Sequence, residues 1–181
     1  QQSAFQVAPI ITTTGYATTD FNLWPETSRS MLVLLMFVGA CAGSTGGGMK
    51  VSRLVILLKT VKKELSQFLH PGRVAKIRMD GKVVEHETIR SINVFMVAYL
   101  LIFSLSVLAL SFDGTDMITN FTAVAATFNN IGPGLEQAGP ATNFAMFSNV
   151  SKLVMTFDML AGRLEIFPVL LLFVRDTWRK F

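Results

Sequence analysis

A glycine-rich stretch that ends in lysine is the first feature of the sequence that could do chemistry. Residues 39–50 read GACAGSTGGGMK and directly follow the apolar run MLVLLMFV. Glycines before a lysine suggest a loop that binds phosphate through its backbone, but that motif needs Gly-Lys followed by Ser or Thr. Here Gly48 is followed by Met49, Lys50 and Val51, so the lysine and hydroxyl positions both fail. The stretch therefore does not fit a phosphate loop.

Two further segments combine a central glycine with hydroxyl or amide side chains. They read TTTGYA at residues 12–17 and NNIGPG at residues 129–134. Because glycine takes positive φ without a Cβ clash, such a segment can align successive backbone carbonyls. Aligned carbonyls replace the hydration shell of a cation, which is the chemistry of a selectivity filter. Two ordinary surface turns are the alternative interpretation.

The elements around these segments are typical of a membrane protein. Of the 181 residues, 51% are hydrophobic and 15% are charged, against roughly 25% charged in soluble domains. Residues 92–112 carry no charge and have about the length that a bilayer core requires of a helix. Residues 30–59 and 143–174 are also long and apolar, but the first contains the glycine stretch. The second contains charges that normally face a bundle interior or an aqueous path, namely Lys152, Asp158, Arg163 and Glu165. Buried helices of a soluble protein are the alternative.

Residues 3–22 and 120–140 are too short to span a bilayer. Each opens with a helix-like apolar stretch and then changes to Thr, Asn, Gly and Pro, which favours a re-entrant segment that lines a cavity. A re-entrant segment followed by a long helix thus occurs twice, with Gly15 and Gly132 in equivalent places. The helix at 92–112 precedes the second unit, and the first unit lacks its counterpart. We therefore expect the chain to be a fragment of a larger protein.

The charges predict an orientation in the membrane. Most of the sixteen Lys and Arg residues lie in the region 50–90, whereas the loops around the two glycine segments carry mainly acidic side chains. By the positive-inside rule, the basic region is cytoplasmic. We therefore expect Asp80 on the cytoplasmic side and Asp116 outside.

A polar linker, residues 64–91, separates the two units. The pair Asp80-Gly81 between short β-prone runs predicts a type I′ hairpin. His70 and His86 lie in this linker without a nearby Cys or a ligand spacing, so we interpret both as solvated side chains. The lone Cys41 excludes a disulfide framework within the chain.

Four stretches together resemble the membrane subunit of Trk-type potassium uptake systems, in the superfamily of Trk, Ktr and plant high-affinity potassium transporters. They are TTTGYATTDFN, GACAGSTGGGMKVSR, FNNIGPG and LAGRLEIF. The resemblance covers nearly the whole chain and implies an all-α membrane protein, in which helix–pore loop–helix repeats surround a central ion pore. Residues 1–63 would be the third repeat without its first helix, residues 64–91 a short hairpin-like cytoplasmic linker, and residues 92–181 the fourth repeat.

The resemblance also implies which residues form the site. The potassium filter would contain Thr13, Thr14, Gly15 and Tyr16 of the third repeat with Asn130, Ile131, Gly132 and Pro133 of the fourth. The gate would be an intramembrane loop that contacts an arginine of the fourth repeat, and it would contain Gly43, Ser44, Thr45, Gly46, Gly47, Gly48 and Arg163. Since Pro133 and the asparagines depart from the Thr-Val-Gly pattern of potassium channels, we expect looser selectivity that admits rubidium and some sodium.

The expected function is passive potassium uptake through a channel-like pore in a bacterial or archaeal plasma membrane. Potassium, held by backbone carbonyls, would be the only metal, and no covalently bound cofactor or catalytic residue is expected. The resemblance implies a homodimer in the lipid bilayer and a cytosolic nucleotide-binding regulatory subunit. Nucleotide would act only through that subunit, and no nucleic acid is expected.

Two other functions are weighed against a passive pore. The first is a symporter coupled to protons or sodium, in which Asp158 or Glu165 carries a proton, although either could instead pair with Lys152 or Arg163. The second is a membrane-embedded enzyme, which finds no nucleophile–base pair or metal cluster in the sequence.

Overall fold

The chain is mostly helical in a computed structural model, which describes residues 2–39, 41, 43–44, 46–71, 76–164 and 166–178. The α-helices are α1 Gln2–Ile11, α2 Glu26–Phe37, α3 Val51–Leu69, α4 His86–Ser111, α5 Met117–Phe128, α6 Asn149–Leu164 and α7 Ile166–Leu171. Short 3₁₀ turns lie at η1 Phe21–Leu23, η2 Glu136–Ala138, η3 Phe144–Met146 and η4 Arg175–Trp178. The strands are β1 Arg78–Met79 and β2 Lys82–Val83. The predicted all-α class is confirmed.

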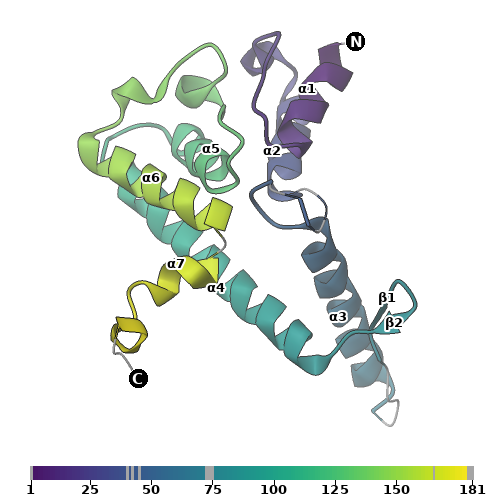
Figure 1. The fold of residues 1–181 in the computed structure, drawn as a ribbon. Helices are drawn as coiled ribbons and strands as arrows, with labels where there is room; N and C mark the ends of the chain where they lie inside the picture. The colour runs from purple at the N-terminus through teal and green to yellow at the C-terminus, as the bar shows by residue number, and fades with distance from the viewer. Residues whose placement is uncertain are drawn as a thin grey trace.

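Helix α4 is the central element of the second unit. It has 26 residues, and in the described part of the chain it is the one helix long and apolar enough to cross a membrane. The helix expected at residues 92–112 is thus confirmed, and it begins earlier, at His86. Glu85 is extended at its N-cap, and Glu87 lies in the first turn, where a negative charge suits the helix dipole. Helices α5, α6 and α7 pack against α4, as Figure 1 shows.

The hairpin in the linker is also confirmed. Strands β1 and β2 pair antiparallel, and the two residues between them both have positive φ, 50° at Asp80 and 77° at Gly81. Positive φ at both central positions is what a type I′ turn requires.

The two long apolar segments are both interrupted. The first is divided between α2, which ends at Phe37, and α3, which begins at Val51. The segment 143–174 contains η3, α6 and α7, and Glu165 between α6 and α7 lies outside the described residues. Pro168 lies in the first turn of α7, a position that proline tolerates because its missing N–H would have no partner within the helix.

Aromatic rings join α2, α4 and α5 into one core. Phe103 of α4 contacts Phe37 of α2 and Phe121 of α5, with ring centroids 5.6 and 5.2 Å apart. Tyr99 lies one turn earlier on α4, and its ring is 4.7 Å from Phe128 at the end of α5. Edge-on and tilted contacts of this kind stabilise beyond simple area burial. The core therefore fixes the end of α5 against the long helix.

A hydrogen bond joins the two ends of the segment between α4 and α6, which contains α5. The backbone N–H of Ser148, just before α6, donates to the Asp113 carboxylate at 2.9 Å, just after α4. This hydrogen bond holds the pKa of Asp113 below its usual value. Asp116 caps α5 by accepting from the N–H of Thr119 at 2.9 Å. Both contacts fix where the short helix α5 enters.

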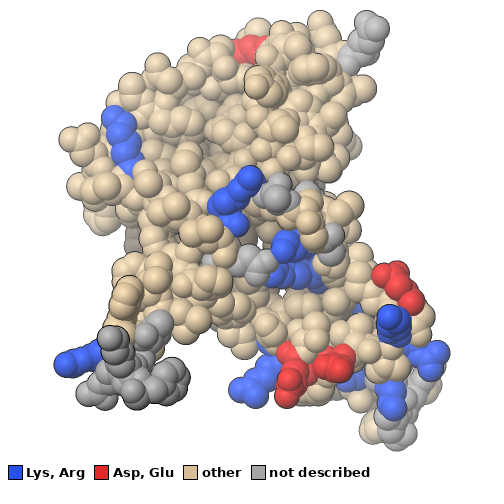
Figure 2. Space-filling model, in the orientation of Figure 1, with Lys and Arg blue, Asp and Glu red and all other residues tan. Residues whose placement is uncertain are grey.

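The two ends of the molecule differ in charge. In Figure 1 the hairpin, the lower end of α3 and the C-terminus lie at the bottom, and α1 and the loops around η2 lie at the top. Figure 2 shows that Lys and Arg side chains gather on the lower part of this face, while the upper part is nearly free of them. The basic residues that cluster in the sequence therefore also cluster at one end of the structure.

Candidate filter and gate

Helices α1 and α5 end in the same backbone motif. Thr13 and Asn130 both have a φ of 56°, the left-handed conformation. The N–H of the following residue then donates back to Pro9 at 2.9 Å in the first case and to Ala126 at 2.8 Å in the second. This six-residue bond after a left-handed residue is a Schellman ending. A left-handed β-branched residue such as Thr13 is a genuine outlier, which costs of order 1–3 kcal/mol.

A glycine with positive φ follows each left-handed residue at the same spacing. The φ angle is 71° at Gly15 and 114° at Gly132. We name residues 12–17 segment I and residues 129–134 segment II. The equivalence of the two glycines, inferred from the sequence alone, therefore extends to the backbone geometry around them.

Segments I and II meet backbone to backbone. A Cβ built on Gly15 would lie 2.0 Å from the carbonyl oxygen of Ile131 and 3.2 Å from Cδ of Pro133. By contrast, a Cβ on Gly132 would meet nothing within 4 Å. The structure thus brings Gly15 together with Ile131 and Pro133.

The side chains of segment I face different surroundings. Tyr16 is 74% exposed and contacts little of the described chain. The hydroxyls of Thr12 and Thr14 lie 3.2 Å apart, and the Thr12 hydroxyl donates to the carbonyl of Ala8 at 2.8 Å. The hydroxyl groups therefore hold the start of segment I to the end of α1.

We name residues 39–50 the glycine loop, and two of its residues, Gly47 and Gly48, lie against segment II. Val38 and Met49 form a bridge that closes the loop at its base. A Cβ on Gly47 would lie 2.6 Å from the carbonyl oxygen of Asn129, and one on Gly48 would lie 2.6 Å from the Asn129 side-chain oxygen. Glycine is needed at both positions because no side chain fits between the loop and Asn129.

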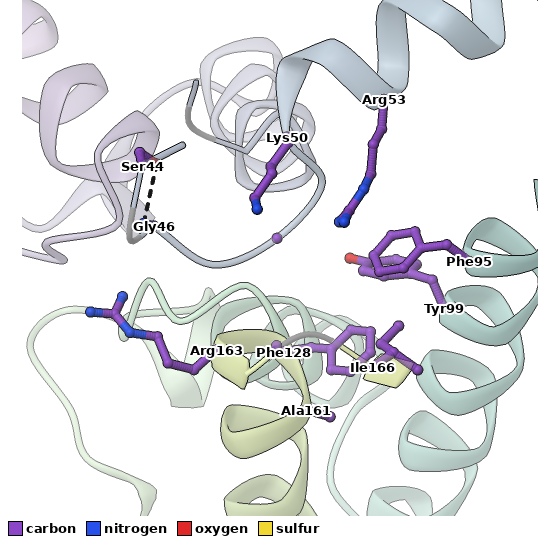
Figure 3. A pocket seen from close by; sticks show the side chains of 12 residues that line it. Ser44, Gly46, Lys50, Arg53, Phe95, Tyr99, Phe128, Ala161, Arg163 and Ile166 are labelled. Carbon is purple, nitrogen blue, oxygen red and sulfur yellow. Dashed lines mark hydrogen bonds between the residues drawn. The ribbon is translucent and has the colours of Figure 1, made fainter. Parts of the chain in front are cut away.

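A cavity of about 60 Å³ lies between the glycine loop, α4 and α6 (Figure 3). From the predicted gate it is lined by Ser44, Gly46, Gly48 and Arg163. Gly43 is an exposed turn residue with a φ of 87°, and Gly47 is buried against segment II. The remaining predicted gate residue, Thr45, lies outside the described residues.

Comparison with known proteins identifies the family. The model of the TrkH family, described as cation transport protein, matches residues 1–180. The chain belongs to the TrkH family. It is 39% identical over 179 residues to the Trk system potassium uptake protein TrkH of Salmonella typhimurium, covering 99% of this chain and 37% of that protein. It is also 37% identical over 178 residues to TrkG of Escherichia coli, covering 98% of this chain and 36% of that protein.

A solved structure agrees with this assignment. The crystal structure of the potassium transporter TrkH from Vibrio parahaemolyticus superposes with a TM-score of 0.88 at 40% identity. The match covers 98% of this chain and 38% of that one. This TrkH-family chain therefore has the helical fold of that transporter and spans little more than a third of the length of its relatives.

Arg163 lines the cavity of this TrkH-family chain. In Figure 3 its guanidinium extends from α6 toward the side of the loop that carries Ser44 and Gly46. Among the described residues it makes no hydrogen bond or ion pair. Asp158, one predicted partner, instead accepts from the Ser106 hydroxyl of α4 at 2.8 Å. The other predicted partner, Glu165, lies outside the described residues.

Two more cationic side chains line the same cavity of the TrkH-family fold. Lys50 ends the glycine loop and Arg53 lies in the first turn of α3. Figure 3 shows that both side chains point toward the cavity from the side across from Arg163 and α6. The Arg53 guanidinium also lies 4.1 Å from the ring centroid of Phe95. The position of Lys50 at the end of the glycine stretch was the sequence signal for its place at the cavity.

A hydrogen-bonded pair that sequence reasoning missed supports segment II of the TrkH-family chain. The Tyr99 hydroxyl of α4 donates to the side-chain oxygen of Asn129 at 2.9 Å, and the Asn129 amide donates to the carbonyl of Ala125 at 2.8 Å. Asn129 is fully buried. The only sequence signal was one tyrosine within an apolar helix.

Proposed function

We propose that this chain supplies two neighbouring quarters of a potassium-conducting pore in a bacterial or archaeal plasma membrane. Residues 1–63 would be the third repeat, residues 92–181 the fourth, and residues 64–91 the cytoplasmic linker. The observation that carries the proposal is the identical Schellman ending of α1 and α5, each followed by a glycine with positive φ. Potassium is proposed as the conducted ion because the relatives are named as potassium uptake proteins.

Segments I and II would form the filter. Four carbonyl-bearing segments around an axis replace the hydration shell of potassium, and the negative ends of α1 and α5 favour a cation beside them. The membrane potential then drives inward movement by about 2.3 kcal/mol per charge per 100 mV. No chemical step is needed, so the pore requires no catalytic residue.

The glycine loop and Arg163 would form the gate. Gly47 and Gly48 lie directly against Asn129 at the base of segment II, which supports a loop that blocks the path below the filter. A guanidinium stays charged under all accessible conditions, so Arg163 opposes a potassium ion in the cavity beneath. Opening then requires the loop to move aside, and its glycines permit that motion.

The position of Asp158 favours passive conduction over proton-coupled symport. A proton-carrying carboxylate has to reach the aqueous path. Asp158 is instead fully buried between α4 and α6, where it binds Ser106, and it does not line the cavity.

The basic lower end would face the cytoplasm. There it is a suitable docking surface for the nucleotide-binding regulatory subunit, and the complete protein would form a homodimer in the bilayer. We place α3 and the hairpin on this side because Lys and Arg gather there (Figure 2).

Uptake by cells tests the proposal. The full-length protein is expressed in bacteria that lack their own potassium uptake, and intracellular potassium is measured at low external concentration. We expect accumulation that exceeds that of cells without the transporter and that collapses when the membrane potential is dissipated. A well-expressed protein that gives no accumulation would refute the function.

A further inference from the structure

Two side chains of the other unit hold the loop that follows segment II. We infer that Asn22 and Arg29 are positioning residues that clamp the loop after segment II to the first unit. This clamp sets cation selectivity, an inference that rests on the proposed pore. Asn22 belongs to η1 and Arg29 to α2, and neither lies in the filter segments or in the cavity. Their common target is Glu136.

The side-chain amide of Asn22 makes two hydrogen bonds to the backbone of Glu136, one through its nitrogen and one through its oxygen. Its Nδ2 donates to the carbonyl oxygen of Glu136 at 3.1 Å, and the Glu136 N–H donates to its Oδ1 at 2.9 Å. Glu136 has a φ of 52°, an unfavourable conformation for a non-glycine residue. A Cβ at Gly139 would lie 2.1 Å from Nδ2 of Asn22, so the glycine leaves room for this side chain. The contact therefore holds a strained loop residue in place.

Arg29 binds the side chain of the same residue. Its guanidinium donates to the Glu136 carboxylate across the two units and, at 3.2 Å, to Glu26 within its own helix. The Arg29 side chain is 13% exposed, and of its two partners the Glu136 side chain is 41% exposed and that of Glu26 is 76% exposed. Charge-assisted bonds are the strong class, and partial burial limits screening of the pair with Glu136. The pair between units therefore carries more structural weight than the pair within α2.

The clamped loop is connected to the end of the filter. Gly134, the last residue of segment II, immediately precedes it. On its other side the loop is bound to α5, since the N–H of Leu135 donates to the Thr122 hydroxyl at 2.9 Å and that of Gln137 to the Thr119 hydroxyl at 3.3 Å. Loosening the clamp leaves α5 intact but frees segment II to shift against segment I. The expected effect is on ion discrimination rather than on folding.

The test measures potassium and sodium permeability of the full-length protein in liposomes. The wild-type protein is measured first, because absence of potassium flux through it would refute the proposed pore and not the clamp. Arg29→Gln and Asn22→Ala should each lower the potassium-to-sodium permeability ratio about threefold or more while potassium still permeates. Glu26→Gln, the matched control, removes only the pair within α2 and should keep the wild-type ratio.

A charge swap separates the pair from a general effect of either residue. Arg29→Glu combined with Glu136→Arg restores an opposite-charge pair, and its ratio should lie closer to wild type than that of either single variant. If Asn22→Ala does not yield folded protein, Asn22→Asp keeps the acceptor and removes the donor, and it should lower the ratio too. Folded Arg29→Gln and Asn22 variants with the wild-type ratio would overturn the clamp, and so would a Glu26→Gln ratio as low as theirs.

Discussion

Replacing Gly15 by alanine is the substitution to which the candidate filter should be most sensitive. The added methyl group would lie 2.0 Å from the carbonyl oxygen of Ile131, a distance that real Cβ atoms do not show. Real Cβ atoms essentially never lie closer than 3.0 Å to such an atom, so segments I and II must separate by at least about 1 Å. Because the displaced atom is itself a proposed filter carbonyl, ion binding is altered directly.

The backbone at Gly15 adds a second penalty. Its φ of 71° is left-handed, where a residue with a Cβ costs roughly 1–2 kcal/mol. If the filter absorbs that energy, ion affinity changes by about 5- to 30-fold before the steric shift is counted. Gly132 is the matched comparison, because its φ of 114° is also unfavourable but a Cβ there meets nothing within 4 Å. Gly132→Ala should therefore be the milder change.

The assay compares potassium and sodium flux for both alanine variants of the full-length protein. Size-exclusion chromatography and thermal unfolding in detergent verify that each variant is folded. We expect Gly15→Ala to lose most potassium flux or most of its preference over sodium, and Gly132→Ala to keep flux with a reduced preference. A folded Gly15→Ala protein that matches wild type, or one that is less affected than Gly132→Ala, would refute the contact between the segments.

Three further predictions follow from the gate, the topology and the core. Arg163→Ala should raise potassium flux in liposomes without the regulatory subunit, because a fixed charge leaves the cavity. In a background free of other cysteines, Asp80→Cys should react with a membrane-impermeant thiol reagent only from the cytoplasm and Ala141→Cys only from outside. Tyr99→Phe should destabilise the protein by about 1 kcal/mol, because Asn129 loses a buried donor, and its melting temperature in detergent should fall.

Each of these has a clear contrary result. A folded Arg163→Ala protein with wild-type or lower flux would remove the arginine from the gate. Exchanged labelling at Asp80 and Ala141 would invert the topology and move the filter to the other side. An unchanged melting temperature for Tyr99→Phe would mean that its hydroxyl does not support Asn129.

Local patterns predicted the elements that have local causes. The uncharged run at 92–112 predicted α4, the Asp80-Gly81 pair predicted the hairpin, and the glycine segments predicted where α1 and α5 end. In each case neighbouring residues determine the backbone, through hydrophobic length or through tolerance of positive φ.

The contacts between units could not be predicted in this way. Asn22 meets Glu136, and Tyr99 meets Asn129, only because the packing of helices brings distant parts of the chain together. A single polar residue in an apolar or loop segment does not reveal its partner. The meeting of Arg53 with Arg163 at one cavity likewise depends on the path of the glycine loop, which periodicity does not describe.

Flux through the purified full-length protein tests the central claim most directly. Liposomes with a set potassium gradient and no proton or sodium gradient are monitored for potassium movement and for membrane potential. A passive potassium pore predicts a flux that follows the potassium electrochemical gradient, sets the potential near the potassium equilibrium value and moves little sodium. Absence of flux until a proton or sodium gradient is imposed, or equal movement of sodium and potassium, would contradict it.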